Sequence, residues 1–148
     1  KLTYGYSYAS NRNYQEDLVN ATSDELYGYD TLHRPTSFNR GDLNVNKDAI
    51  AAPTRRQTWT LSDIGNWTNI ATKDNGNFLR PYEDRTHNTA NEITQIDPLA
   101  INGDNPAAYD LVHDDAGNLT SLPTTDGSPD HKFVYDYRNR LIQVKTQA

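Results

Sequence analysis

Four histidines are the side chains in this sequence of 148 residues best suited to metal chemistry: His33, His87, His113 and His131. His87 and His113 lie at equivalent positions of an internal repeat, so stacked repeats would bring them together, and Asp114 or Asp115 could add a carboxylate. An open His/His/carboxylate set of this kind would suit a divalent transition metal. The favoured alternative is that both imidazoles replace tyrosine rings as half-buried side chains of a sheet. We therefore expect no metal ion and no other cofactor.

Motifs for catalysis are missing from the sequence. It has no nucleophile elbow, no His-Glu-x-x-His pair and no glycine-rich phosphate loop. Neighbouring carboxylates such as Asp114 and Asp115 occur, but general acid/base catalysis needs carboxylates that are paired in space. We expect that the protein is not an enzyme.

Aromatic rings flanked by Asp and Asn are the candidates for binding carbohydrate. They are Trp59, Trp67, Tyr82 and Tyr109. A ring of this kind can pack against the apolar face of a pyranose while carboxylates and amides bind its hydroxyls. The favoured alternative places the same rings in the sheet as structural side chains.

Three Asn-x-Thr sequons begin at Asn20, Asn66 and Asn118. A sequence this rich in Asn, Ser and Thr contains such triplets by chance. Because they fall in predicted turns, the three asparagines are kept as candidate glycosylation sites.

Composition and charge exclude several classes of protein. The chain has 20 acidic and 14 basic residues, for a net charge of −6, and no basic cluster that would bind nucleic acid or an anionic membrane. Without a long apolar stretch it is not expected to insert into a bilayer. Without cysteine it has no disulfide framework and no thiolate metal site. Because it starts at Lys1 with no signal segment, we expect a mature product or a piece of a larger protein.

Tyrosine, asparagine and aspartate dominate the sequence in a way that favours sheets and turns. There are ten Tyr residues, and Asn and Asp occur 16 times each. Asn and Asp cap turns and tolerate left-handed backbone. Helical periodicity is weak everywhere, and we expect at most one helical turn, between Tyr14 and Leu26.

A local pattern recurs six times along the chain. It is aligned on an anchor that is always Asp, Asn or Ser. The anchors are Ser7, Asp30, Ser62, Asn88, Asp114 and Asp136, with spacings of 23, 32, 26, 26 and 22 residues. Before each anchor, large residues alternate as in a half-buried strand. The anchor residue types are those that cap a type I turn.

The third residue after each anchor suits left-handed backbone in four copies, at Gly65, Asn91, Gly117 and Asn139. A left-handed residue that follows a type I turn closes a three-residue hairpin with a bulge. Each copy is therefore predicted to be a β-hairpin. The residues before the anchors should form a column of stacked rings across neighbouring hairpins: Tyr6, Tyr29, Leu61, His87, His113 and Tyr135.

These motifs resemble the RHS repeat, also called the YD repeat, of bacterial toxin-shell proteins and teneurin-like proteins. The resemblance rests on Tyr-x-Tyr-Asp-x-x-x-Arg at 27–34, Asp-x-x-Gly-Asn at 114–118 and Tyr-Asp-x-x-Asn-Arg-Leu at 135–141. It implies long antiparallel sheets that spiral into a ribbon or shell. It also implies a bacterial protein that is secreted or displayed at the cell surface. In such proteins the repeats encapsulate toxins or mediate cell-surface contact and carbohydrate binding.

The sequence thus predicts an all-β fold, with residues 1–148 as a single domain of about six hairpins. Its ten to twelve antiparallel strands should form one continuous curved or spiralling sheet. Linkers are expected near 42–54, 72–82, 97–108 and 123–131. Because open sheet ends recruit further strands, the expected partners are copies of the chain or neighbouring repeats, joined through sheet edges into a fibre or shell wall. The alternatives are a segment of a toxin-encapsulating shell and a glycan-binding adhesin module.

Overall fold

The structure is a computed structural model that describes residues 1–101, 103, 106–123 and 130–147. The prediction of an all-β fold with antiparallel pairing is confirmed. The strands of the described residues are β1 (Leu2–Tyr6), β2 (Arg12–Asp17), β3 (Glu25–Tyr29), β4 (Pro35–Arg40), β5 (Arg55–Leu61), β6 (Trp67–Asp74), β7 (Asn77–His87), β8 (Ile93–Pro98), β9 (Tyr109–Asp110), β10 (Val112–His113), β11 (Leu119–Leu122), β12 (Asp130–Tyr135) and β13 (Leu141–Gln147). A 3-10 turn, η1 (Ala21–Ser23), lies in the segment where one helical turn is expected.

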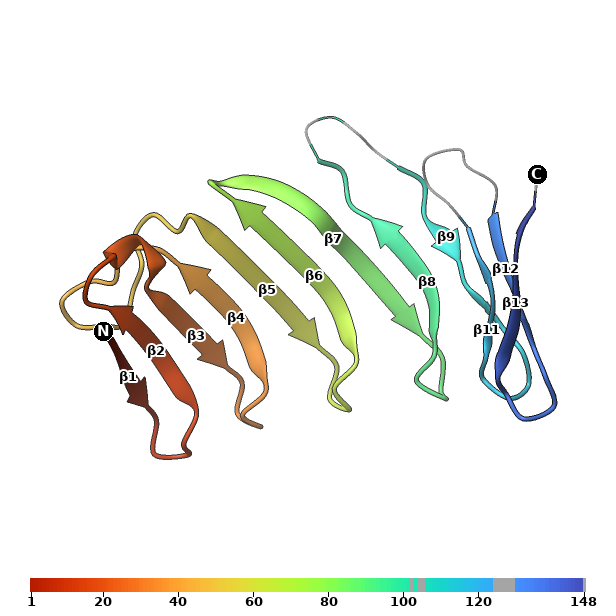
Figure 1. Cartoon of the computed structure of the whole chain (residues 1–148), viewed down its shortest axis with the longest axis horizontal. Coiled ribbons are helices and arrows are strands. Elements are labelled where there is room, and N and C mark those ends of the chain that lie inside the picture. The colour runs from red at the N-terminus through yellow and green to blue at the C-terminus, as the bar shows by residue number, and fades with distance from the viewer. Residues whose placement is uncertain (102, 104–105, 124–129, 148) are drawn as a thin grey trace. The chain divides into compact units, whose positions relative to one another are not determined.

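The chain divides into two compact units, Lys1–Tyr82 and Glu83–Ala148, and strand β7 runs through the boundary. In each unit, strands that are neighbours in the chain are neighbours in the sheet. In the first unit the turns of the hairpins β1–β2, β3–β4 and β5–β6 all lie at the same end of the strands (Figure 1). The second unit contains the hairpins β7–β8, β10–β11 and β12–β13.

The hydrogen-bonded ladder is interrupted in the second unit, which differs from the predicted continuous sheet. The strands form one ladder from β1 to β9 and another from β10 to β13. Residues 109–113 are nearly one extended run, but Tyr109 and Asp110 pair with β8, whereas Val112 and His113 pair with β11. Between them the amide of Leu111 still donates to the carbonyl of Thr94, at 2.8 Å. The run therefore changes partners at Leu111.

The predicted linker over 72–82 is wrong, because most of it is strand. Asn75 and Gly76 have φ angles of 47° and 80° and connect β6 directly to β7. Two consecutive left-handed residues make the two-residue turn that joins strands most tightly, and Asn-Gly is its strongest sequence signal. The segment 42–54 is a loop closed by the Leu43–Ile50 bridge. Asp97 and Pro98 end β8, and the remainders of the predicted loops 97–108 and 123–131 lie partly outside the described residues.

Very few apolar side chains are buried. Among the described residues these are Leu43 and Ile70. The ring pairs of the described residues do not include members of the predicted column before the anchors, in which Tyr6 is mostly exposed. They are Tyr27–Phe38, Trp59–Trp67 and Phe78–Tyr82. A sheet with so small a core depends on cross-strand side-chain pairs for its stability.

A polar and aromatic cluster joins β2, β3 and β4 in the first unit. The Arg12 guanidinium lies 4.5 Å from the centre of the Tyr27 ring and donates to its hydroxyl, which donates to Glu25. Arg40 bonds the second oxygen of Glu25 at 2.7 Å. Partial burial opposes ionisation of Glu25, but the hydrogen bonds from Tyr27 and Arg40 outweigh it and hold the pKa of Glu25 below its usual value. Burial and then the Glu25 carboxylate raise the pKa of Tyr27 to about 12.

The carboxylate of Asp24 attaches the loop after β4 to the start of β3. Asp24 is only 2% exposed. Its Oδ1 accepts the amide of Asp17 at 2.7 Å and its Oδ2 accepts the amide of Leu43 at 3.3 Å. Its backbone carbonyl accepts the amide of Gly41 at 3.0 Å. One buried carboxylate thus satisfies donors from the end of β2 and from the loop.

Asp24→Asn should destabilise the protein. An amide NH2 group cannot accept, so either the Asp17 or the Leu43 amide loses its partner in a buried place. We expect a loss of about 1–3 kcal/mol in the free energy of unfolding, measured by urea denaturation at pH 7. Asp42→Asn, at an exposed neighbouring carboxylate, is the control and should change the urea midpoint very little. Equal midpoints for the two variants would contradict the role given to Asp24.

Candidate functional site

The six hairpin turns share one backbone geometry. In each, the amide of the anchor donates to the carbonyl four residues later, and the amide of the third residue donates back to the anchor carbonyl. The pairing register shifts immediately before every anchor, as a bulge requires. The third residues all have left-handed φ angles, between 57° and 95°: Ser10, His33, Gly65, Asn91, Gly117 and Asn139. Ser10 and His33 take this conformation without the favourable residue type.

The anchor side chain holds each turn closed. At all six anchors, a side-chain oxygen accepts the backbone amide of the fourth residue after it, at 2.9–3.2 Å. The Asp and Asn anchors also accept the amide of the second residue. Ser7 and Ser62, with one oxygen on a shorter side chain, make only the first of these bonds among the interactions of the described residues. Carboxylate and amide anchors therefore hold the turn by two bonds.

The residue four positions after each anchor is here called the brace residue, because in four of the six copies it contacts the next turn. The brace residues are Asn11, Arg34, Asn66, Glu92, Asn118 and Arg140. Arg34 binds its own anchor Asp30 through Nε at 2.7 Å, and its Nη1 donates to the carbonyl of Ser62, the next anchor, at 2.9 Å. Within the second unit Asn118 donates to Asn139 of the following turn, at 3.1 Å.

Two further braces reach the left-handed residue of the next turn. The amide nitrogen of Asn11 lies 2.9 Å from Nδ1 of His33. A side-chain oxygen of Glu92 lies so close to Gly117 that a Cβ there would be only 2.8 Å from it. Neighbouring hairpins are therefore joined at their turns as well as along their strands.

The turn bonds lower the pKa of three anchor carboxylates. The backbone amide of Arg34, followed by its guanidinium, holds the pKa of Asp30 below its usual value. The side-chain amide of Asn118 does the same for the pKa of Asp114, and the guanidinium of Arg140 for the pKa of Asp136. In each case donors stabilise the ionised carboxylate.

The four candidate carbohydrate-binding rings lie in three places. Trp59 and Trp67 belong to the β5–β6 hairpin, with ring centres 6.3 Å apart, and Trp67 is exposed. Tyr82 stacks on Phe78 of the same strand at 4.2 Å. Tyr109 is half-buried in β9 of the second unit. Carbohydrate binding by these four rings stays a prediction.

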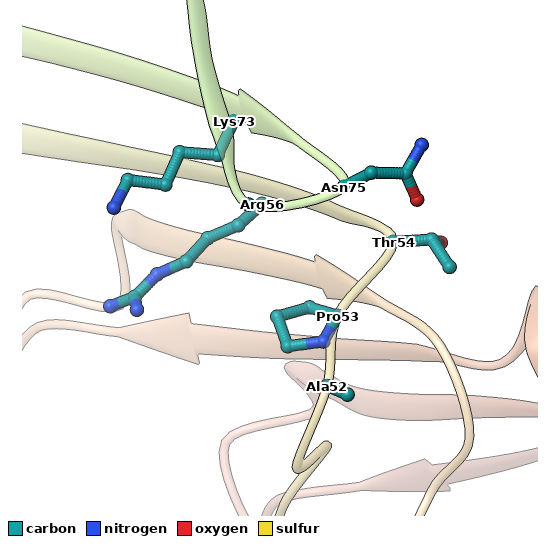
Figure 2. Close-up of a pocket in the computed structure, with 7 residues that line it drawn as sticks. Ala52, Pro53, Thr54, Arg56, Lys73 and Asn75 are labelled. Carbon is teal, nitrogen blue, oxygen red and sulfur yellow. The ribbon is translucent and has the colours of Figure 1, made fainter.

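Two adjoining hollows in the first unit share Arg56 and Lys73, and together we call them the basic hollow. One has a volume of about 490 Å³ and is lined by Ala52, Pro53, Thr54, Arg56, Lys73, Asn75 and Gly76. The other has a volume of about 320 Å³ and is lined by Arg56, Thr58, Asn69, Ala71, Lys73, Phe78 and Tyr82. Figure 2 shows Arg56 and Lys73 extending in the same direction from neighbouring strands. The basic hollow has both ionic and aromatic groups.

The two cations of the basic hollow lie opposite each other on neighbouring strands. Arg56 and Lys73 face each other across β5 and β6, a like-charge pairing that is unfavourable unless an anion intervenes. In the part of the chain that the structure describes, neither cation forms an ion pair. The ammonium group of Lys73 lies instead 4.0 Å from the centre of the Phe78 ring.

The histidines do not assemble a metal centre. Among the described residues, no three His, Asp or Glu side chains lie close enough to hold a metal ion, so His87, His113 and Asp114 or Asp115 are not brought into such a set. His33 contacts Asn11, and Nδ1 of His131 is buried without a hydrogen-bond partner among the described residues. No helix of the described residues is long and apolar enough to cross a bilayer.

The three sequon asparagines differ in how their side chains are used. Asn20 is exposed before η1 and bonds Thr22 and Ser23. Asn66 is a half-buried brace residue. Asn118 donates to both Asp114 and Asn139, so a glycan attached there would displace a turn-to-turn contact.

Sequence reasoning found the anchors but missed the braces and the basic hollow. The Arg of Tyr-Asp-x-x-x-Arg at 34 and 140 was a local signal for a brace. The basic hollow had none, because Arg56 and Lys73 meet only when β5 pairs with β6. In comparisons with known proteins, no family model and no curated protein matches the sequence.

Replacing three anchor carboxylates should make the stability of the protein less dependent on acidic pH. A carboxylate whose pKa is lower in the folded chain than in the unfolded chain stabilises the fold at pH values above its usual pKa. This stabilisation is lost as the pH falls from about 4 through the lowered pKa of the folded chain. The variant Asp30→Asn/Asp114→Asn/Asp136→Asn keeps a turn-capping amide like that of Asn88. Its urea midpoint should fall less between pH 6 and pH 3 than that of the unsubstituted chain.

The control for this experiment is Asp42→Asn/Asp63→Asn/Asp115→Asn, at three exposed carboxylates. This control should keep the full acid sensitivity. If both triple variants respond to pH alike, the anchors do not act as charged caps.

Proposed function

We propose that the chain is a non-enzymatic structural module of a secreted or cell-surface RHS/YD-repeat protein, whose open sheet edges support end-to-end assembly into a fibre or shell wall. The observation that carries the proposal is that each of the outermost strands pairs with a neighbour on one side only. Within the described residues β1 pairs only with β2, and β13 only with β12. Unpaired edge strands expose backbone donors and acceptors that another strand can satisfy.

The side chains of the two edge strands support the same proposal. Both strands expose large apolar residues: Leu2, Tyr4 and Tyr6 on β1, and Leu141, Ile142 and Val144 on β13. Proline is missing from both edge strands, and Lys145 near the end of β13 is the charged side chain on them. With so little buried apolar surface, each hairpin gains stability mainly from its neighbours, as in other repeat arrays.

The shell-segment alternative uses the same edges but needs many more repeats to enclose a toxin. The six hairpins of this chain would then supply one stretch of wall. In both hypotheses the edge strands form the functional surface. In a fibre they pair with further copies of the chain, whereas in a toxin shell they pair with further repeats of the shell.

End-to-end assembly is tested with the purified 148-residue chain. Light scattering over a concentration series should show a mass that rises with concentration, and electron microscopy should show filaments or rings, because heterologous contacts produce one or the other. A monomer at every concentration up to about millimolar would overturn this function, since specific edge pairing weaker than that would be negligible.

The basic hollow favours a second candidate function, the binding of acidic carbohydrate. Its volume lies in the range of small-ligand sites. Arg56 and Lys73 could bind a carboxylate or sulfate, and Tyr82 offers a ring for a pyranose. An anion between the two cations would also relieve their mutual repulsion.

Calorimetric titration with trigalacturonate, and with maltotriose as the neutral comparison, tests this candidate. Trigalacturonate should bind, and Arg56→Gln/Lys73→Gln should weaken it by at least about tenfold, equivalent to about 1.4 kcal/mol. Arg55→Gln, next to Arg56 but outside the basic hollow, is the matched control. Equal binding of the two sugars, or no binding of trigalacturonate, would remove the candidate.

A further inference from the structure

The register between neighbouring hairpins follows one rule. At the four junctions whose register the structure gives, the residue seven positions after one anchor faces the residue four positions before the next anchor. The facing pairs are Tyr14 with Leu26, Ser37 with Thr58, Gln95 with Asp110 and Ser121 with Lys132. Two of these junctions lie in the first unit and two in the second, despite different loop lengths. At these four junctions the lateral register is therefore constant relative to the anchors.

We propose that a second copy of the chain docks by this rule, with its β1 pairing antiparallel to β13 of the first copy. This inference rests on the proposed end-to-end assembly and specifies its junction. Counting seven positions from Asp136 and four back from Ser7 places Gln143 opposite Thr3 of the second copy. Ile142 then faces Tyr4, and Val144 faces Leu2.

The side chains match in this register. Ile142 and Val144 are 62% and 54% exposed, and Leu2 and Tyr4 are each 44% exposed. The register pairs these four apolar side chains on one face and pairs polar Gln143 with polar Thr3 on the other. A slip of one residue would turn one set of apolar side chains to the opposite face. Lys145 would face Lys1 at the end of the ladder, a like-charge pair that salt screens.

Arg140 provides a second, independent match at the turn. It binds its anchor Asp136 through Nε at 2.8 Å, as Arg34 binds Asp30 at 2.7 Å. The side chain of Arg34 is 27% exposed and continues to the carbonyls of Ser62 and Asp63 in the next turn. The side chain of Arg140 is 68% exposed. In the docked pair the corresponding acceptors are the carbonyls of Ser7 and Tyr8 of the second copy.

Disulfide trapping tests the register, because the natural chain has no cysteine. Thr3→Cys and Gln143→Cys chains are mixed in equal amounts, oxidised at 0.15 M salt and separated without reductant. Directly facing residues of antiparallel strands have Cα atoms within disulfide range. The mixed dimer should therefore be the main product. Lys145→Cys mixed with Thr3→Cys is the control, since its diagonal position is too distant, and should give at least about tenfold less dimer.

The outcomes separate this inference from the proposed function. Gln143→Cys homodimers as the main product would show tail-to-tail pairing, and equal trapping through Lys145→Cys would show another register. Either result overturns the inference. Assembly by light scattering without any trapping also overturns it while leaving end-to-end assembly standing. A chain that stays monomeric removes both.

Substitutions at the edge test the side-chain match without cysteine. Ile142→Lys/Val144→Lys should raise the concentration needed for assembly by at least about tenfold. Leu32→Lys/Ile64→Lys, at exposed apolar residues of two turns, is the matched control and should leave it unchanged. Arg140→Gln should also raise it, whereas Arg138→Gln should not. Unchanged circular dichroism would show that all variants fold, and unaltered assembly of the edge variants would contradict the inference.

Discussion

The hydrogen bond from each anchor side chain to the amide four residues later is the interaction on which the rest of the structure depends. It occurs in all six hairpins, with Asp, Asn or Ser as acceptor. By closing the turn it places the bulge, and the bulge sets which residue of one strand faces which of the other. At the four junctions whose register the structure gives, neighbouring hairpins also pair at a constant offset from their anchors. The braces then fasten one turn to the next, as Arg34 does with Ser62.

A sheet built in this way is stabilised mainly by contacts between its strands and contains only a small apolar core. Leu43 and Ile70 are the buried apolar side chains among the described residues. Their place is taken by contacts between strands, such as the Arg12–Tyr27–Glu25 cluster, and by a buried carboxylate at Asp24. Contacts of this kind stabilise nearest neighbours, so stability grows with the number of hairpins. The outermost strands are the weakest part of such a sheet and also the part most able to accept another strand.

The hairpins could be predicted from sequence because their determinants are local. Asp114, Gly117 and Asn118 lie within five residues, and their types alone indicate a type I turn with a left-handed residue. Asn75-Gly76 was an equally local signal, hidden in a segment whose polar composition suggested a linker. The change of partners at Leu111, the buried position of Asp24 and the meeting of Arg56 with Lys73 could not be predicted. Each depends on which strands become neighbours, and no short stretch of sequence encodes that.

Amide hydrogen exchange at low and high protein concentration tests the central claim most directly, namely that the edges of the sheet are unfilled positions of a regular ladder. In an antiparallel edge strand alternate amides point outward. Our account predicts that alternate amides of β1 and β13 become protected as the concentration rises, while the amides of β3 to β6 keep the same protection. Protection of β1 and β13 that does not change with concentration would contradict it.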